Sequence, residues 1–166
     1  QTRVTMAERN VTTMCVSARV PQRQMAAVVG AVAAAVAPTR GLLHRLEGSD
    51  LIVTWNAAGV VSPLPRTTGV DVALQVAEAL MRKEIAAVVA LASGVCVAGT
   101  AGGAKFQQFQ VLGAPHRLPS AMAHAFEALV PRCDAGWVPV LVDQTMADVL
   151  GEHFKLLPVG RLCARA

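Results

Sequence analysis

A chain of 166 residues is long enough for one ordinary domain with a substantial core and too short for two. Apolar residues make up 54% of it and charged residues 16%, a balance that excludes a disordered chain. The net charge is +4, but the basic residues are scattered and tyrosine is absent, which argues against the basic, aromatic-lined surface of a nucleic-acid-binding protein.

The first third of the chain predicts a strand, a helix and a hairpin. Residues 11–19 (VTTMCVSAR) are rich in β-branched side chains and end before a proline, which is typical of a strand. Residues 21–37 carry apolar side chains at helical spacing and end before another proline. Two short apolar runs, 42–46 and 51–55, flank Gly48, which permits the positive φ of a tight turn between antiparallel strands.

The middle of the chain predicts a second helix between a loop and a buried strand. Residues 56–68 are rich in Gly, Pro and Ser and predict a surface loop. Residues 70–83 carry an apolar stripe at helical spacing, and residues 86–98 form a nearly continuous apolar run that indicates a central strand. The glycines of 99–103 predict a turn before a further strand at 106–112.

The last third of the chain predicts shorter elements. A third helix is expected from Gly113 to about residue 129, followed by a strand at 138–142. A helical turn at 144–150 and a closing strand at 154–159 complete the pattern.

The predicted element order indicates an α+β fold. The order β-α-β-β-α-β is that of a ferredoxin-like core, here with additional C-terminal strands and a helix. We expect residues 1–10 to be an N-terminal flank and residues 11–166 to be one domain. Because Gln1 rather than Met comes first, we expect the chain to be a piece of a longer polypeptide. The longest apolar stretch, 25–37, is shorter than the ~20 residues that a membrane span needs.

The cysteines and histidines show no ligand spacing. No CxxC or comparable metal-binding pattern occurs, and the four histidines are not clustered. Cys15 and Cys96 lie in apolar runs predicted to be strands, where a free thiol behaves as a small apolar side chain. With Cys133 and Cys163 equally isolated, we expect a reduced, cytoplasmic setting.

Four segments carry a resemblance to a known family. Residues 46–55 (LEGSDLIVTW) resemble the F-x-G-D-x-x-x-x-x-F hairpin of class III adenylyl and guanylyl cyclases. Residues 94–102 (GVCVAGTAG) look like the family's G-x-V-x-A-G-x-x-G strand and turn, and residues 109–113 (FQVLG) match its Y-x-V-x-G strand. Residues 150–160 are similar to its L-x-x-x-F-x-x-x-x-L-G ending. The motifs follow the family's order, and the family's fold agrees with the predicted ferredoxin-like core.

The resemblance implies a particular site and chemistry. In active members, two such domains pair head to tail and build the site across their interface. Two aspartates bind two metal ions, which activate the ribose 3′-hydroxyl and stabilise charge on the α-phosphate. A Lys or Glu together with an Asp, Thr or Cys reads the base, an Asn positions the ribose, and an Arg stabilises the transition state.

Each of these family positions is changed in this chain. The two metal aspartates fall on Ser17 and Ser49, base reading on Arg45 and Gln110, the ribose asparagine on Arg117, and the transition-state arginine on Ala121. A serine hydroxyl is a neutral, weak ligand, whereas Mg²⁺ sites depend on carboxylates. The resemblance therefore implies a domain without a two-metal site.

Several nearby residues leave alternatives open. Asp50 follows the missing second aspartate directly, but strand alternation predicts that its side chain lies on the opposite face from Ser49, leaving it a weak metal candidate. Arg45, His116 and Arg117 are candidates for binding an anion or nucleotide. Pro119 predicts that the third helix begins later than in the family.

The expected function is a catalytically inactive nucleotide cyclase homology domain, not an enzyme, that acts as a regulatory or dimerisation module in cyclic-nucleotide signalling. The alternatives are a weak or partner-dependent adenylyl or guanylyl cyclase and a non-catalytic nucleotide or anion sensor. We expect no cofactor, with Mg²⁺ or Mn²⁺ needed only for residual activity. The expected partner is another cyclase-like domain, in a homodimer or heterodimer. We expect no binding to nucleic acid. We also expect that the chain is the cytosolic portion of a larger, membrane-bound protein and that only other parts of that protein contact the membrane.

Overall fold

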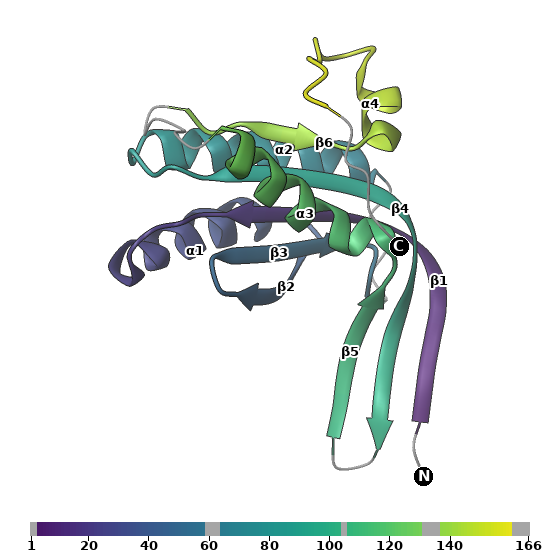
Figure 1. Cartoon of the computed structure of the whole chain (residues 1–166). Coiled ribbons are helices and arrows are strands. Elements are labelled where there is room, and N and C mark those ends of the chain that lie inside the picture. Colours follow the sequence, from purple (N-terminus) through teal and green to yellow (C-terminus); the bar gives the residue numbers. More distant parts are fainter. Residues whose placement is uncertain (1–2, 59–63, 104–105, 131–136, 161–166) are drawn as a thin grey trace.

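The computed structural model describes residues 3–58, 64–103, 106–130 and 137–160, without the side chains of residues 3, 45–47 and 106. The elements are β1 (Arg3–Ser17), α1 (Gln22–Val36), β2 (Leu42–Glu47), β3 (Asp50–Trp55), α2 (Pro65–Met81), β4 (Val88–Gly103), β5 (Phe106–Leu112), α3 (Ala114–Leu129), β6 (Val140–Val142) and α4 (Gln144–Leu150) (Figure 1). This order confirms the predicted α+β class.

One mixed sheet organises the molecule. Its strand order is β2-β3-β1-β4-β5, with the short β6 pairing in parallel with β4. The four strands of the β-α-β-β-α-β unit, β1 to β4, pair with one another in antiparallel fashion, and β1 lies between β3 and β4. This is the strand arrangement of a ferredoxin-like core, as the sequence predicts.

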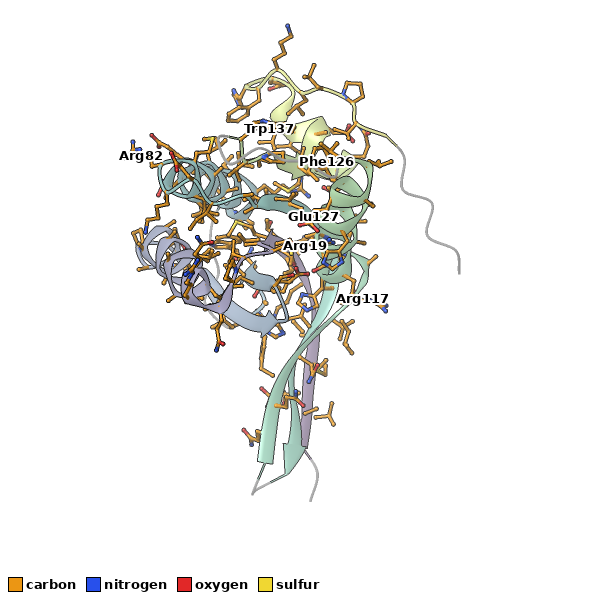
Figure 2. The ribbon with its side chains drawn as sticks, turned by 60° about the vertical axis from the view of Figure 1, so that its left-hand side comes forward. Arg19, Arg82, Arg117, Phe126, Glu127 and Trp137 are labelled. Carbon is orange, nitrogen blue, oxygen red and sulfur yellow. The ribbon has the colours of Figure 1, made fainter. Side chains whose placement is uncertain are left out.

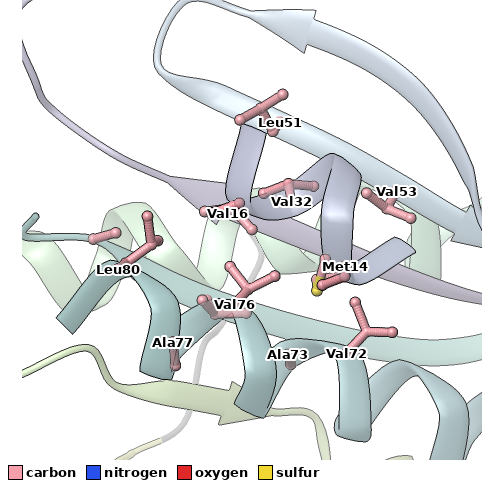
Figure 3. Packing of buried hydrophobic residues seen from close by; sticks show 14 of the residues in the cluster. Met14, Val16, Val32, Leu51, Val53, Val72, Ala73, Val76, Ala77 and Leu80 are labelled. Carbon is pink, nitrogen blue, oxygen red and sulfur yellow. The ribbon is translucent and has the colours of Figure 1, made fainter. Parts of the chain in front are cut away.

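Two helical layers cover the two faces of this sheet. Helices α1 and α2 pack on one face, where the main core contains Met14 and Val16 of β1, Val53 of β3 and Val76 and Leu80 of α2 (Figure 3). Helix α3 crosses the other face (Figure 1). There its apolar side packs on β4, through a small cluster of Ala123 and Phe126 with Val88 and Ala90. This apolar cluster covers only part of the second face, so the rest of that face can carry polar side chains.

A three-stranded arm projects from the body of the domain (Figure 1). Arg3 to Asn10 of β1 pair with the distal part of β4, and β5 pairs with that part from the other side. The prediction that β1 begins at Val11 is therefore wrong, and so is the predicted turn at 99–103, which is strand. Gly99 serves strand pairing rather than a turn, because it lets the backbones of β1 and β4 approach closely. A Cβ at this position would lie 1.8 Å from the carbonyl oxygen of Thr5.

Other boundaries differ in ways that local chemistry explains. Helix α2 begins at Pro65 rather than Val70, because a proline suits the first helical turn, where no N–H partner is needed. Helix α3 begins at Ala114 and continues through Pro119, so the later start predicted from that proline is wrong. The residue lacks one backbone hydrogen bond, but it is buried in the packed helix.

The C-terminal segment gives one further correction. β6 and α4 form where the sequence predicts them, but the closing strand at 154–159 is absent. Residues 151–160 are exposed and extend past α4 without strand pairing to the described residues. An apolar pattern favours a strand only when a neighbouring strand offers hydrogen bonds, and no such neighbour is described beside this segment.

Candidate functional site

The sheet face beneath α3 carries the polar residues of β1 and β3. In the register of these strands, Ser17 lies opposite Asp50, and Thr13 lies opposite Thr54. Residues directly opposite in an antiparallel pair point to the same face. All four side chains are buried or nearly so. This is the face on which the cyclase resemblance places the metal aspartates.

Ser17 is not placed to bind an ion from solvent. It is 0% exposed, and its hydroxyl has no hydrogen-bond partner among the described residues. Ser49 lies in the turn between β2 and β3, where its backbone carbonyl accepts a hydrogen bond from the amide of Ala18 at 3.1 Å. Its hydroxyl lies at 3.5 Å from Oδ1 of Asp50, at the limit of a hydrogen bond. Neither serine replaces a metal carboxylate.

Asp50 lies on the same face as Ser17, and this corrects the argument from strand alternation. That argument assumes that Ser49 is part of the strand, whereas β3 begins at Asp50. The Asp50 side chain is 9% exposed, and its Oδ2 lies 3.1 Å from Nε2 of His124 on α3. One carboxylate is therefore present near the family's metal position, and a histidine of the same chain already engages it.

Cys15 lies between these polar pairs at the floor of the face. It is fully buried and accepts a hydrogen bond from the Ser120 hydroxyl at 3.4 Å. Burial raises the pKa of its thiol to about 12, so it is neutral and a poor nucleophile at ordinary pH. Burial also raises the pKa of Cys96. Both free thiols act as small apolar groups, as predicted, while Cys133 and Cys163 lie outside the described residues.

A pocket of about 440 Å³ opens beside this face. It is bounded by β2, β3, the end of β5 and the first half of α3. Its lining consists of His44, Asp50, Ile52, Gln110, Val111, Leu112, Gly113, His116, Arg117, Ser120 and His124. Its half-polar wall distinguishes it from the smaller, mainly apolar pocket near Gly41.

The pocket brings together some of the residues singled out in the sequence and excludes others. Gln110, His116, Arg117 and Asp50 line it. Ser17 and Ser49 do not, and Ala121 lies on an exposed side of α3. Figure 2 shows Arg117 on α3, near the point where the arm leaves the body. The backbone of Arg45 pairs with Ile52, but its side chain lies outside the described residues.

Three lining residues, His44, Ser120 and His124, were missed by the sequence argument. His116, Ser120 and His124 follow one another at intervals of four, so they share one face of α3. That spacing was the available signal. His44 comes from β2, and its ring lies 5.1 Å from the His116 ring and 5.8 Å from that of Phe109. Only the curvature of the sheet brings this strand close to β5 and α3.

Two glycines set the position of α3 against the sheet. A Cβ at Gly94 would lie 2.8 Å from Cγ of Pro115, in the first turn of α3. Gly113 has a φ of +149°, and a Cβ there would lie 3.1 Å from the Cys96 sulfur. Both glycines belong to the motifs that resemble the cyclases. They allow the helix to start directly over β4, at the edge of the pocket.

The described residues do not form a metal centre. Among them, no group of three or more His, Cys, Asp or Glu side chains is placed to hold an ion. Two divalent ions side by side need several carboxylate oxygens, whereas Asp50 is the one carboxylate among the described residues that line the pocket, and it is paired with His124. The residues therefore do not fit the two-metal site of an active cyclase. In the same described part of the chain, no helix is long and apolar enough to cross a membrane.

Comparison with solved structures identifies the fold. The guanylyl cyclase Cya2 is 14% identical, with a TM-score of 0.70 over 93% of this chain and 88% of that one. The adenylyl cyclase CyaB from P. aeruginosa is 9% identical, with a TM-score of 0.70 over 90% of this chain and 84% of its own. The dimeric guanylyl cyclase domain of the RhoGC fusion protein from Blastocladiella emersonii is 14% identical, with a TM-score of 0.70 and coverages of 94% and 90%. No protein-family model and no curated protein matches the sequence. The chain has the fold of class III adenylyl and guanylyl cyclase catalytic domains.

Proposed function

We propose that this chain, which has the class III nucleotide cyclase fold, is a catalytically inactive cyclase homology domain that serves as a regulatory or dimerisation module in cyclic-nucleotide signalling. The observation that carries the proposal is the pair of Ser17 and Asp50 beneath α3. The resemblance assigns the two metal aspartates to Ser17 and Ser49; Ser17 offers only a buried hydroxyl, and the neighbouring carboxylate of Asp50 is paired with His124.

The half of the site that would bind metal lacks the charged ligands that the metal needs, and α3 covers the position. Ser17 cannot supply the negative charge that offsets dehydration of Mg²⁺. It is also covered, since α3 lies over this face and His124 of that helix engages Asp50 at 3.1 Å. Binding of two metal ions would require both new carboxylates and displacement of α3.

The half of the site that would act on the nucleotide is altered as well. Ala121 stands at the position of the transition-state arginine and offers no charge. In related phosphoryl transfers, loss of such an arginine removes ~10³-fold or more of the rate. Arg117 replaces the ribose asparagine, and Gln110 replaces one base-reading residue. Because both halves are altered, neither composite site in a dimer with an intact cyclase domain would be complete.

The dimerisation role is supported by the surface of the arm and by one of the solved relatives. The guanylyl cyclase domain of the RhoGC fusion protein is described as a non-canonical dimer, and a double mutant of that domain as monomeric. In the present chain, the arm exposes Val95, Val97 and Leu112 on one face, with exposures between 37% and 58%. Contiguous exposed apolar side chains mark interaction surfaces in soluble domains. A second cyclase-like domain, identical or different, is the partner that this surface would take, in the cytoplasm as part of a larger protein.

Two measurements test the proposal together. The chain is incubated with ATP or GTP and Mn²⁺, with an active cyclase domain as the positive control, and cyclic product is measured. Its mass in solution is followed by sedimentation over a range of concentrations, alone and with an active cyclase domain. We expect no product above the blank and a concentration-dependent dimer. Turnover by the chain alone, or a strict monomer that binds no cyclase domain, would contradict the proposal.

A weak, partner-dependent cyclase is the second candidate, and the position of Asp50 favours it. This carboxylate lies on the same sheet face as the first metal position, opposite Ser17. If it bound one ion with groups from a partner, mixing the chain with an active cyclase domain would add activity beyond that of the partner. Asp50→Asn would then abolish the gain, whereas an unchanged rate would exclude this candidate.

A further inference from the structure

The segment that follows α4 exposes a run of apolar side chains. Every residue from 151 to 160 is exposed. The exposed fraction reaches 77% at Leu157 and 59% at Val159, and Phe154 and Leu156 are the other large apolar side chains of the segment. Soluble domains rarely leave contiguous apolar side chains in water, and such a run marks a surface that contacts a partner.

Pro158 limits the kinds of partner that fit this segment. It has no backbone N–H, so it interrupts the hydrogen-bond ladder of a strand added to a sheet edge and that of a helix laid in a groove. Leu156 and Leu157 are also adjacent, so a strand would carry apolar side chains on both of its faces. The partner must therefore accept apolar side chains without regular backbone pairing.

The sequence of this segment and of the residues after it is basic. From residue 153 to residue 166 it contains Lys155, Arg161 and Arg165 and no acidic residue. Asp148 and Glu152 come before this stretch, on α4 and in the turn after it. The same stretch in a second copy of the chain would carry the same charge, so pairing of two copies through it would bring like charges together. An apolar segment with basic flanking residues is instead complementary to an anionic, partly apolar surface.

A tryptophan lies at the same end of the molecule. Trp137 is 49% exposed, and its ring packs edge-on against Phe126 with 5.9 Å between the ring centroids. Figure 2 shows Trp137 at the end that carries α4, and Figure 1 shows this end opposite the arm. Tryptophan is enriched where proteins meet the headgroup region of a bilayer, because its ring is apolar and its N–H is polar.

We propose that residues 153–160, together with Trp137, bind the surface of an anionic phospholipid bilayer. The apolar side chains enter the boundary between headgroups and acyl chains, and the basic residues attract the anionic headgroups. The headgroup region contains water, unlike the hydrocarbon core, so the backbone of an irregular segment stays hydrated there.

Membrane contact by this chain itself goes beyond the proposed function. It differs from the sequence-based expectation that only other parts of a larger protein contact the membrane. The arm lies at the opposite end of the molecule, so a bilayer and a second cyclase-like domain do not compete for one surface (Figure 1).

Binding of the complete chain to lipid vesicles tests this inference. Vesicles of phosphatidylcholine alone, and vesicles that also contain phosphatidylserine, are sedimented with the chain, and the bound fraction is measured. We expect binding to the anionic vesicles to be at least about tenfold tighter, because each basic residue near an anionic surface contributes about fivefold. Tryptophan fluorescence gives a second measurement. Trp55 is fully buried, so a blue shift of the emission on binding reports on Trp137.

Two single substitutions identify the segment as the site. Leu157→Ser is expected to weaken binding to anionic vesicles about tenfold, because the leucine no longer leaves water on binding. Lys155→Gln is expected to weaken it about fivefold and to leave binding to neutral vesicles unchanged. The matched controls are Leu74→Ser, at a leucine of α2 that is 44% exposed, and Lys83→Gln, at an exposed lysine after α2. Both should bind as the parent chain does, and a thermal melt of every variant verifies folding.

Four results would overturn the inference. Three are an absence of binding to either kind of vesicle, equal binding to both kinds, and an equal loss in Leu157→Ser and Leu74→Ser. The fourth is self-association without lipid that Leu157→Ser abolishes, because it would assign the segment to a second copy of the chain. Formation of cyclic product would contradict the proposed function and leave vesicle binding unchanged.

Discussion

The pairing of Asp50 with His124 connects α3 to the face of the sheet beneath it. Asp50 is almost fully buried, and a buried carboxylate without a partner is costly. We predict that His124→Ala lowers the free energy of unfolding by about 1 to 3 kcal/mol. Urea denaturation measures this loss. His153→Ala, at an exposed histidine, should change little. Equal stability of the two variants would show that the pair contributes nothing.

The Cys15 thiol gives a pH-dependent prediction. Burial raises its folded pKa to about 12, from an ordinary value of 9.0 in the unfolded chain. Above pH 9.0 the unfolded thiol loses its proton while the folded thiol keeps it, so the contribution of Cys15 to stability is lost as the pH rises toward 12.

Thermal or urea unfolding at about pH 8 and about pH 10 measures the effect. The parent chain should lose more stability over this interval than Cys15→Ala, which has no thiol to titrate. Other groups, including Cys96, titrate in both proteins and cancel in the comparison. Identical slopes for the two proteins would mean that the thiol is less well shielded than its burial indicates.

At the scale of elements, Gly99 controls the junction of β1 and β4. A Cβ there would lie 1.8 Å from the Thr5 carbonyl oxygen, and the obstacle is backbone rather than a mobile side chain. We predict that Gly99→Ala separates the first residues of β1 from the arm. Hydrogen exchange should show faster exchange at residues 3–10, with the body of the sheet still protected.

Gly30→Ala is the matched control, because it lies inside α1 with nothing within 4 Å of an added Cβ. Replacing a helical glycine by alanine should raise stability by about 0.5 to 1 kcal/mol. Unchanged exchange in the arm of Gly99→Ala would mean that the strands tolerate a wider separation.

The sequence predicts elements well where their signal is local. The turn at Gly48, the helix after Pro21 and the strand at Phe106–Leu112 depend on nearby residues, and they form as predicted. The length of β1 and β4 depends on backbone approach across the sheet, which no local pattern reveals. The strand expected at 154–159 fails for the related reason that a strand needs a partner.

The candidate site also contains residues that the sequence predicts and residues that only the fold brings together. Family motifs in register place Gln110 and Arg117 at the pocket, because a resemblance carries tertiary information. His44 and His124 stand far apart in the sequence, and only the folded sheet and α3 bring them to one cavity. The side of Asp50 is mistaken in the sequence argument because Ser49 lies in the turn before β3, so strand alternation does not relate the side chains of these two neighbours.

The described residues form a body with a projecting arm, and one face of this arm exposes several apolar side chains. Val97 of β4 lies directly opposite Leu112 of β5, and Val95 is two residues away on the same face. We predict that Val97→Glu combined with Leu112→Glu weakens the proposed dimer at least about tenfold, since charges cannot be buried there without partners. Sedimentation equilibrium measures the association constant, and circular dichroism verifies the fold.

Leu74→Glu is the matched control for this prediction. It replaces a leucine of α2 that is 44% exposed and lies away from the arm, so it adds one of the same carboxylates at a comparable apolar position. Association should survive it. If instead Leu74→Glu separates the subunits and the double variant does not, the pairing surface is the helical layer of α1 and α2. The arm would then have a role in the monomer alone, holding the end of β5 in place beside the pocket.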